Sequence, residues 1–243
     1  MSVPKRRPIV SIVAWPCVAL VLLAFVVCAT LLLPHTLLFD RRRTLPARLG
    51  SRGTMLAMWL VRSTRPAIIA LQEARTRRGV VVVVNHRSVV DILLAVGMPG
   101  GPRLLAKQWP ARTPLLGTSL RLAGHLTLDE RDPESVQATL DQARDYLAHG
   151  IPIVFFAEGS RRREPGLSRF RGGAFALAID AQVPVVPVVL HNSGTLVPPG
   201  ALTVNETSVT AEVLEDFSPG NDRRALTRRV HAAMLDRLRD APA

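Results

Sequence analysis

The chain has 243 residues, of which 48% are hydrophobic, and it carries a formal net charge of +12. This length and composition are enough to bury one full core, so we expect one folded domain with an additional apolar segment. Excess Lys and Arg fit either nucleic acid or an anionic membrane surface. Aromatic residues make up only 5% of the chain and are not interleaved with the basic ones, which argues against nucleic acid.

The first predicted element is an apolar segment at the N-terminus. No Asp, Glu, Lys or Arg occurs from Ile9 to Phe39. Ile9 to Leu33 alone is long enough to cross about 30 Å of hydrocarbon at about 1.5 Å per residue. A cleavable signal peptide is the alternative, but the apolar run exceeds the usual ~7–15 residues and no small-x-small site ends it. We therefore expect residues 1–44 to form a membrane anchor built on a transmembrane helix.

Basic residues flank this segment on both sides, at Lys5–Arg7 and at Arg41–Arg43. A helix that dips into one leaflet and returns would explain both flanks, with Pro16 or Pro34 at the bend. The further basic residues at 48 and 52 favour a cytoplasmic position for the domain C-terminal to the anchor. The expected location is the cytoplasmic membrane, with the folded domain on the cytoplasmic face.

Residues 45–78 form the second predicted segment, in which apolar residues alternate with arginines from Leu45 to Leu71. This pattern is typical of an interfacial helix that lies on anionic lipid headgroups. An ordinary amphipathic helix packed on the folded domain is an equally good interpretation.

Residues 79–243 form the third predicted segment, in which strand and helix patterns alternate. Val80–Val84 is a run of valines typical of a strand buried on both faces. Further strands are expected at Leu104–Ala106, Leu126–Leu128, Ile153–Phe156, Val185–Val189, Val204 and Ser208–Val213. Helices are expected to begin near Ser88 and Pro133, the latter capped by Asp132, and to span Gly172–Ala181 and Arg223–Leu238. The alternation predicts an α/β fold with a mostly parallel mixed sheet flanked by helices.

A histidine block, residues 85–91, follows the valine strand. His86 has a carboxylate, Asp91, five residues on, and Asn85 precedes it. A neutral imidazole can take a proton from an alcohol, and a carboxylate on the other ring nitrogen would orient it. The alternatives are a surface histidine and a first-turn helix acid favoured by the helix dipole.

The His-x4-Asp spacing carries little weight alone, because it recurs at His35 with Asp40 and at His231 with Asp236. Only His86 also follows a buried strand and precedes a predicted helix.

A glutamate block, residues 158–161, follows another predicted strand. Gly159 permits close approach of backbone to a ligand, and Arg161 can bind a phosphate through two hydrogen bonds. Glu158 comes directly after apolar residues and needs a partner, for which Arg161 or a substrate hydroxyl would serve. A strand-end salt bridge is the alternative interpretation.

Spacing patterns for other kinds of site are missing from the sequence. The two cysteines, Cys17 and Cys28, both lie in the apolar run, so no disulfide framework is expected. No His/Cys cluster has metal-ligand spacing, and no Walker-type loop or dinucleotide fingerprint occurs. We therefore expect no metal and no cofactor.

Together these blocks resemble a known family, the glycerolipid acyltransferases typified by 1-acyl-sn-glycerol-3-phosphate (lysophosphatidate) acyltransferase. Four blocks occur in the family's order: "NHRSVVD" from Asn85, "GHLTLDER" from Gly124, "FFAEGSRR" from Phe155 and "VPVVPV" from Val183. Phe170-Arg171-Gly172-Gly173 also fits. The resemblance covers roughly Leu71 to Val189, and the ordered set is far more specific than any one block.

The resemblance implies roles for individual residues. His86 would be the catalytic base and Asp91 its orienting partner. The substrate-binding residues would be Asn85, Lys107, Glu158, Gly159, Ser160 and Arg161, with Lys107 and Arg161 on the acceptor phosphate. The implied reaction moves an acyl group from acyl-coenzyme A or acyl carrier protein to the hydroxyl of a lysophospholipid, here 1-acylglycerol-3-phosphate. The implied partners are these two substrates and an anionic membrane surface.

The chain departs from the family pattern at three positions. Ala157 replaces the usual Pro, Ser160 replaces the usual Thr, and Glu130 stands where the second block normally has Arg. Glu130 favours, as an alternative, the same chemistry on another lyso-lipid acceptor such as a lyso-aminolipid. A non-catalytic membrane lipid-binding protein is the alternative from another functional class.

Overall fold

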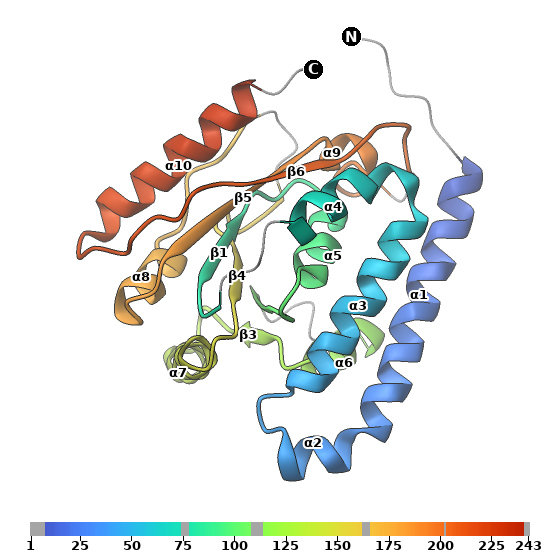
Figure 1. Cartoon of the computed structure of the whole chain (residues 1–243), viewed down its shortest axis with the longest axis horizontal. Helices are drawn as coiled ribbons and strands as arrows, with labels where there is room; N and C mark the ends of the chain where they lie inside the picture. Colours follow the sequence, from blue (N-terminus) through green and yellow to red (C-terminus); the bar gives the residue numbers. More distant parts are fainter. Residues whose placement is uncertain (1–7, 74–77, 108–113, 162–165, 202, 241–243) are drawn as a thin grey trace.

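The centre of the molecule is a sheet in the order β3-β2-β4-β1-β5-β6 (Figure 1). The structure is a computed structural model that describes residues 8–73, 78–107, 114–161, 166–201 and 203–240. The strands are β1 (Val81–Val84), β2 (Arg103–Lys107), β3 (Leu126–Leu128), β4 (Ile153–Phe156), β5 (Val185–His191) and β6 (Thr210–Val213). The first five run parallel and β6 runs antiparallel to β5. The predicted mostly parallel mixed sheet is confirmed.

Strand β1 is central and carries the histidine block at its carboxyl end. Its register pairs Val81 with Ile153 of β4 and with Val185 of β5. All four valines are buried. Because successive side chains of a strand point to opposite faces, Val82 and Val84 enter one core and Val81 and Val83 the other.

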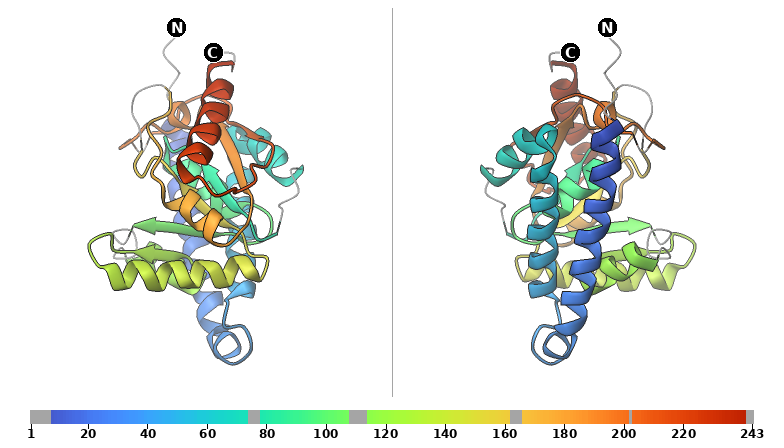
Figure 2. Two further views of the ribbon diagram at one scale, coloured as in Figure 1. Left: turned by 90° about the vertical axis from the view of Figure 1, so that its left-hand side faces the viewer. Right: turned by 90° about the vertical axis from the view of Figure 1, so that its right-hand side faces the viewer.

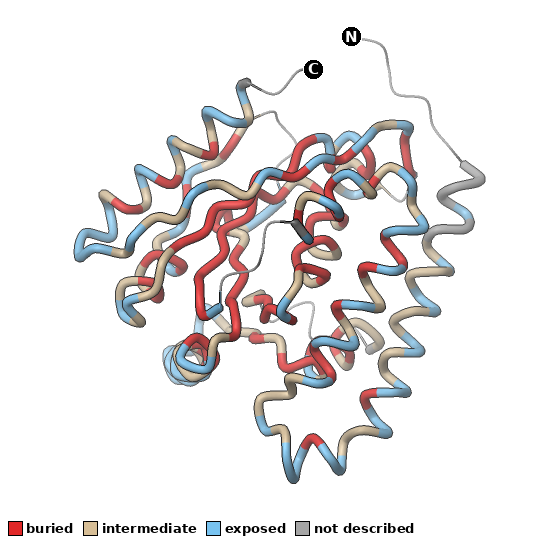
Figure 3. The backbone as a smooth tube through the Cα atoms, viewed as in Figure 1, coloured by how far each residue is buried: buried red, intermediate tan, exposed pale blue. Residues whose placement is uncertain are grey.

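Helices cover both faces of the sheet (Figures 1 and 2). One face carries α3 (Thr44–Leu60), α4 (Arg65–Glu73) and α5 (Val89–Gly97), and the other carries α7 (Pro133–Ala148), α8 (Gly173–Asp180) and α10 (Arg223–Asp240). The buried residues follow the strands and the inner helix faces (Figure 3). Two further helices of the domain are α6 (Pro114–Leu122) and α9 (Ser193–Leu196).

The N-terminal helices form a hairpin along one side of the domain. Helix α1 (Pro8–Leu31) is followed by α2 (Leu33–Phe39) and then by α3, which packs beside α1 (Figure 2). No single helix in the described residues is long and apolar enough to cross a membrane; Trp15–Leu31 and Leu33–Phe39 together would be, but they are bent by 55°. Within the described residues, the structure does not show the expected single transmembrane helix.

Proline accounts for the bend. Pro34 lies in the first turn of α2, where its missing N–H interrupts the hydrogen bonding that would continue α1. Pro16 lies inside α1, away from the bend. Of the two proposed bend positions, the structure uses Pro34.

The turn between α2 and α3 is fixed to the sheet. Arg42 donates two hydrogen bonds of 2.9 Å to Asp145 of α7, and this lowers the pKa of Asp145. The buried Arg103 of β2 donates to the backbone carbonyls of Arg42 and Arg43 at 2.7 and 3.1 Å. A buried charge needs such partners, so the hairpin is held in one orientation on the domain.

The segment from Leu45 to Leu71 is two helices, because the 3₁₀ turn Arg62–Thr64 separates α3 from α4. Met58 and Ile68 face the core, whereas Leu56, Trp59 and Leu60 are exposed. The inner faces fit the packed-helix interpretation and the outer face fits the interfacial one.

One expected strand does not form. Val204 lies in an irregular segment and is buried in the core, where the next residue, Asn205, donates its N–H to the carbonyl of Leu196. Hydrophobicity at a single position reports burial and not strand structure.

Stability should fall in mild acid because of His125. Burial lowers the pKa of His125 to about 3, with a further contribution from the charge of Arg103. Its Nδ1 accepts the N–H of Leu104 at 3.0 Å and is therefore unprotonated. In the unfolded chain His125 binds a proton near pH 6.5, whereas in the folded chain it stays neutral until the pH is near 3. The free energy of unfolding therefore decreases as pH falls from 6.5 toward 3, by up to ~1.4 kcal/mol per pH unit. Urea denaturation at pH 7.5 and pH 5 measures this decrease. His125→Asn, whose side-chain oxygen can still accept from Leu104, should show a shallower pH dependence; an unchanged dependence would contradict the assignment.

Candidate active site

The histidine block places an imidazole at the carboxyl end of the central strand. His86 is 8% exposed and its Nδ1 lies 3.2 Å from Oδ2 of the buried Asp91. Its ring stacks on Phe156 of β4, with 4.1 Å between ring centroids. A carboxylate on Nδ1 favours the tautomer with the proton there, which leaves the Nε2 lone pair as the basic position.

The start of α5 fixes Asp91 in this position. Ser88 is the N-cap of the helix, and Asp91 is its third residue, so the two form a capping box. Oδ2 of Asp91 accepts the backbone N–H groups of Arg87 and Ser88 at 2.6 and 2.7 Å, in addition to its contact with His86. Asp91 is therefore a first-turn helix acid that also contacts the imidazole, and its role as the orienting partner of His86 stays a prediction.

Glu158 holds the backbone of the histidine. Its Oε1 accepts the N–H of His86 at 2.9 Å. Its Oε2 accepts the N–H and the hydroxyl of Ser168 at 2.9 and 2.7 Å. Arg161, the expected protein partner of Glu158, is not the residue that the structure pairs with it. Three donors from two other segments satisfy this buried carboxylate instead.

Asn85 joins the ends of β1 and β5. Its Nδ2 donates to the carbonyl of Leu190 at 2.9 Å, and its Oδ1 accepts the N–H of Leu190 at 2.8 Å. Both polar groups of the amide are thus used within the protein. A direct contact between Asn85 and substrate stays a prediction; these two hydrogen bonds instead fix the position of the next residue, His86.

Gly159 is packed against an arginine that the sequence did not identify as a site residue. Its φ is +75°, and a Cβ there would overlap Nε of Arg171. The Arg171 guanidinium pairs with Glu130 at 2.5 Å, and its backbone N–H binds the carbonyl of Ala157 at 2.7 Å. The close approach expected at Gly159 is thus made by a protein side chain. Glu130 stands where the family pattern has an arginine, and in this chain Arg171 brings a positive charge to that position.

The remaining predicted residues lie at the carboxyl ends of the parallel strands, as His86 does. Ser160 and Arg161 are exposed beyond β4, and Lys107 is the last residue of β2, which runs parallel to β4. The side chain of Lys107 lies outside the described part of the structure. Sequence reasoning missed Phe156, Ser168 and Arg171; the apolar strand end and the Phe-Arg-Gly-Gly block are the signals that would have found two of these.

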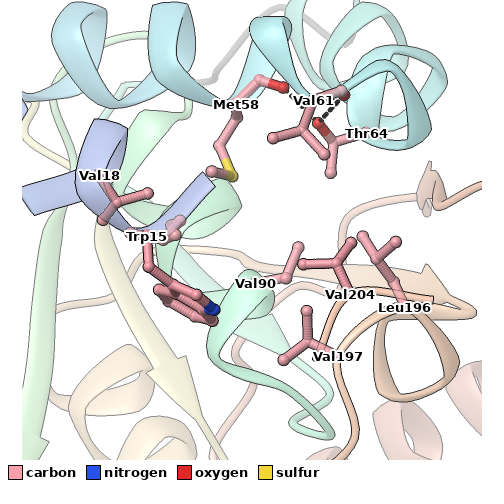
Figure 4. A pocket seen from close by; sticks show the side chains of 10 residues that line it. Trp15, Val18, Met58, Val61, Thr64, Val90, Leu196, Val197 and Val204 are labelled. Carbon is pink, nitrogen blue, oxygen red and sulfur yellow. Dashed lines mark hydrogen bonds between the residues drawn. The ribbon is translucent and has the colours of Figure 1, made fainter. Parts of the chain in front are cut away.

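An apolar crevice lies beside α5, lined by Val90 and by residues from α1 and α3, among them Trp15 and Met58 (Figure 4). The hydroxyl of Thr64, on its wall, is directed at the carbonyls of Met58 and Val61. The crevice has a volume of about 30 Å³, which is room for about one water molecule. It is a packing gap against α1, and an acyl chain would enter only if its walls moved apart.

Comparison with known families agrees with this geometry. A family model described as acyltransferase matches residues 65–191, which is more than half of the chain and includes both blocks. The chain belongs to the acyltransferase family.

Related acyltransferases carry more specific names. A 1-acyl-sn-glycerol-3-phosphate acyltransferase of Chlamydomonas reinhardtii is 33% identical over 172 residues, covering 69% of this chain and 50% of that protein. The enzyme of the same name from Saccharomyces cerevisiae is 28% identical over 173 residues, covering 70% of this chain and 56% of that protein. This acyltransferase therefore spans about half the length of these relatives.

A solved structure shares the fold. The crystal structure of the 1-acyl-sn-glycerophosphate acyltransferase PlsC from Thermotoga maritima superposes with a TM-score of 0.65 and 20% sequence identity. The match covers 92% of this acyltransferase and 97% of that chain. The likeness therefore extends beyond residues 65–191, which the family model matches.

Replacing Glu158 should disturb the site more than removing one of its partners. In Glu158→Gln, an amide NH₂ would face the N–H of Ser168, which leaves buried donors unpaired and costs about 1–3 kcal/mol of unfolding free energy. Ser168→Ala removes only the hydroxyl and should cost about 0.5–1.5 kcal/mol. Urea denaturation and acyl transfer should rank the variants in this order. Equal stability of Glu158→Gln and wild type would contradict the assigned role.

Proposed function

We propose that this acyltransferase moves a fatty acyl group from an acyl thioester to the free hydroxyl of 1-acylglycerol-3-phosphate, which yields phosphatidic acid. The observation that carries the proposal is the His86–Asp91 pair at the carboxyl end of β1, in a chain of the acyltransferase family. The names of the relatives support lysophosphatidate as the acceptor.

The geometry supports a direct transfer. Nε2 of His86 takes the proton of the acceptor hydroxyl while Asp91, on Nδ1, stabilises the imidazolium that forms. The acceptor oxygen attacks the thioester carbonyl, a carbon–oxygen bond forms and the carbon–sulfur bond breaks. The leaving thiolate takes the proton from His86, which restores the neutral imidazole. No covalent intermediate on the protein is needed.

Cationic side chains near the carboxyl ends of the strands are available to bind the acceptor phosphate. Arg161 and Lys107 are the residues implied by the family pattern, and Arg171 lies over Gly159 and pairs with Glu130. Guanidinium groups suit phosphate because they donate paired hydrogen bonds. The carboxylate of Glu130 beside Arg171 is the one feature that favours another headgroup, such as that of a lyso-aminolipid.

We also propose that the protein is membrane-bound through its N-terminal helices. Among the described residues, every exposed large hydrophobic side chain lies between Ile12 and Ile69, and several of these are more than 60% exposed, such as Leu38 and Phe39. Exposed apolar side chains concentrated in one set of helices are a feature of membrane or protein contacts. The basic residues that flank it favour an anionic cytoplasmic leaflet, with the catalytic part on the cytoplasmic face.

Loss of the base should nearly abolish the reaction. His86→Ala is expected to lower kcat by about 10²–10⁴-fold, the usual contribution of a general base. His35→Ala is the matched control, because His35 has the same spacing to a carboxylate but lies exposed on α2. Transfer of labelled acyl groups to lysophosphatidate by detergent-solubilised protein measures both variants. Wild-type turnover in His86→Ala would refute the proposed mechanism.

Charges on the apolar surface should weaken membrane binding. Replacing both Leu38 and Phe39 by Glu places two carboxylates on the hairpin without touching the sheet. Each buried apolar side chain of this size contributes about 1.5–3 kcal/mol, so the partition onto anionic vesicles should drop at least tenfold. Turnover of a detergent-dispersed acceptor should stay close to wild type. Undiminished sedimentation with vesicles would rule out these residues as a membrane contact.

A further inference from the structure

A second concave surface lies next to the glutamate block and has no part in the proposed proton transfer. This groove lies between residues 166–172 and the first half of α10, and it has a volume of about 720 Å³. Four arginines line it, together with one histidine: Arg169, Arg223, Arg224, Arg228 and His231. Leu167 and Phe170 give it an apolar floor.

The groove is rich in positive charge. In the part of the chain that the structure describes, none of its four arginines forms an ion pair. Asp222 is the nearby carboxylate, and it caps α10 by accepting the N–H groups of Arg224 and Ala225 at 2.8 and 3.0 Å. Four guanidinium groups within a groove of this size make a strong anion site.

The groove is connected to the catalytic histidine through the fold. His231 on its wall lies with Nε2 3.1 Å from the carbonyl oxygen of Ser168. Ser168 donates to Glu158, and Glu158 accepts the N–H of His86. Three successive contacts therefore lead from the wall of the groove to the backbone of His86, so the groove and the histidine belong to one hydrogen-bonded network.

The position of the groove argues against a lipid headgroup as its occupant. Helix α10 and the apolar hairpin of α1 and α3 lie on opposite sides of the molecule: α10 is in front in one view of Figure 2, and α1 and α3 are in front in the opposite view. A membrane that contacts the hairpin would therefore leave the groove in water. A soluble, polyanionic ligand fits this place better.

We propose that this groove binds the phosphorylated nucleotide of a coenzyme A thioester, the acyl donor of the proposed function on which this inference rests. The nucleotide carries a 5′-diphosphate and a 3′-phosphate, which several arginines can bind in pairs of hydrogen bonds. The volume falls within the ~300–1,000 Å³ of small-molecule sites. An acidic carrier protein would instead need a broad, shallow surface of about 800 Å².

The test uses adenosine 3′,5′-bisphosphate as the probe and the full chain in detergent. Calorimetric titration compares wild type with the double variant Arg224→Gln, Arg228→Gln. Loss of two charge-assisted contacts should weaken Kd at least tenfold and raise KM for acyl-coenzyme A by a similar factor. The kcat and the KM for lysophosphatidate should stay within about twofold of the wild-type values, because neither arginine contacts His86. Arg239→Gln, on the same helix but outside the groove, is the matched control and should leave every value unchanged.

The outcomes separate the two proposals. If wild type transfers acyl groups from acyl-coenzyme A, two results would overturn the groove assignment alone. In the first, wild type does not bind the bisphosphate. In the second, the double variant binds the bisphosphate as tightly as wild type does. Bisphosphate binding that the variant loses, in a protein without acyl transfer, overturns the proposed function and leaves the nucleotide site. A variant that raises only the KM for an acyl carrier protein overturns the nucleotide assignment and shows that the groove receives a protein.

Discussion

The candidate site depends on one buried carboxylate. Glu158 is 6% exposed, and an ionised group in that position is tolerated only when its oxygens are hydrogen bonded. The donors come from two other segments, the backbone of His86 at the end of β1 and Ser168 in residues 166–172. Satisfying this charge therefore fixes the histidine and the loop together. The loop in turn carries Arg171 onto Gly159 and forms one wall of the arginine-rich groove.

Features encoded by neighbouring residues could be predicted from the sequence. The run of valines located β1 within one residue, because four consecutive β-branched residues suit a strand buried on both faces. The N-cap Asp132, which accepts the N–H of Glu134, set the start of α7 as expected. The pairing of His86 with Asp91 was also predictable, since both groups lie within one turn of the same helix start.

Features that depend on distant residues were not predicted. Arg161 is the cation nearest to Glu158 in sequence, but it lies exposed at the strand end, whereas the neighbouring strand brings the N–H of His86 to 2.9 Å. A solvated guanidinium gains little from such a pair, while a buried N–H without an acceptor is costly. The position of Arg171 over Gly159 also follows from tertiary packing, and no local pattern reports it.

The placement of β1 also determines when the site can form during synthesis. The hydrogen bonds of Asn85 to Leu190 join residues 105 apart, and Glu158 lies 72 residues after His86. Contacts of such long range form slowly, because the intervening chain must be ordered first. The apolar N-terminal helices leave the ribosome well before β5 has been made. A nascent chain therefore exposes its most hydrophobic segment early and acquires its catalytic geometry last, so any attachment to a surface precedes activity.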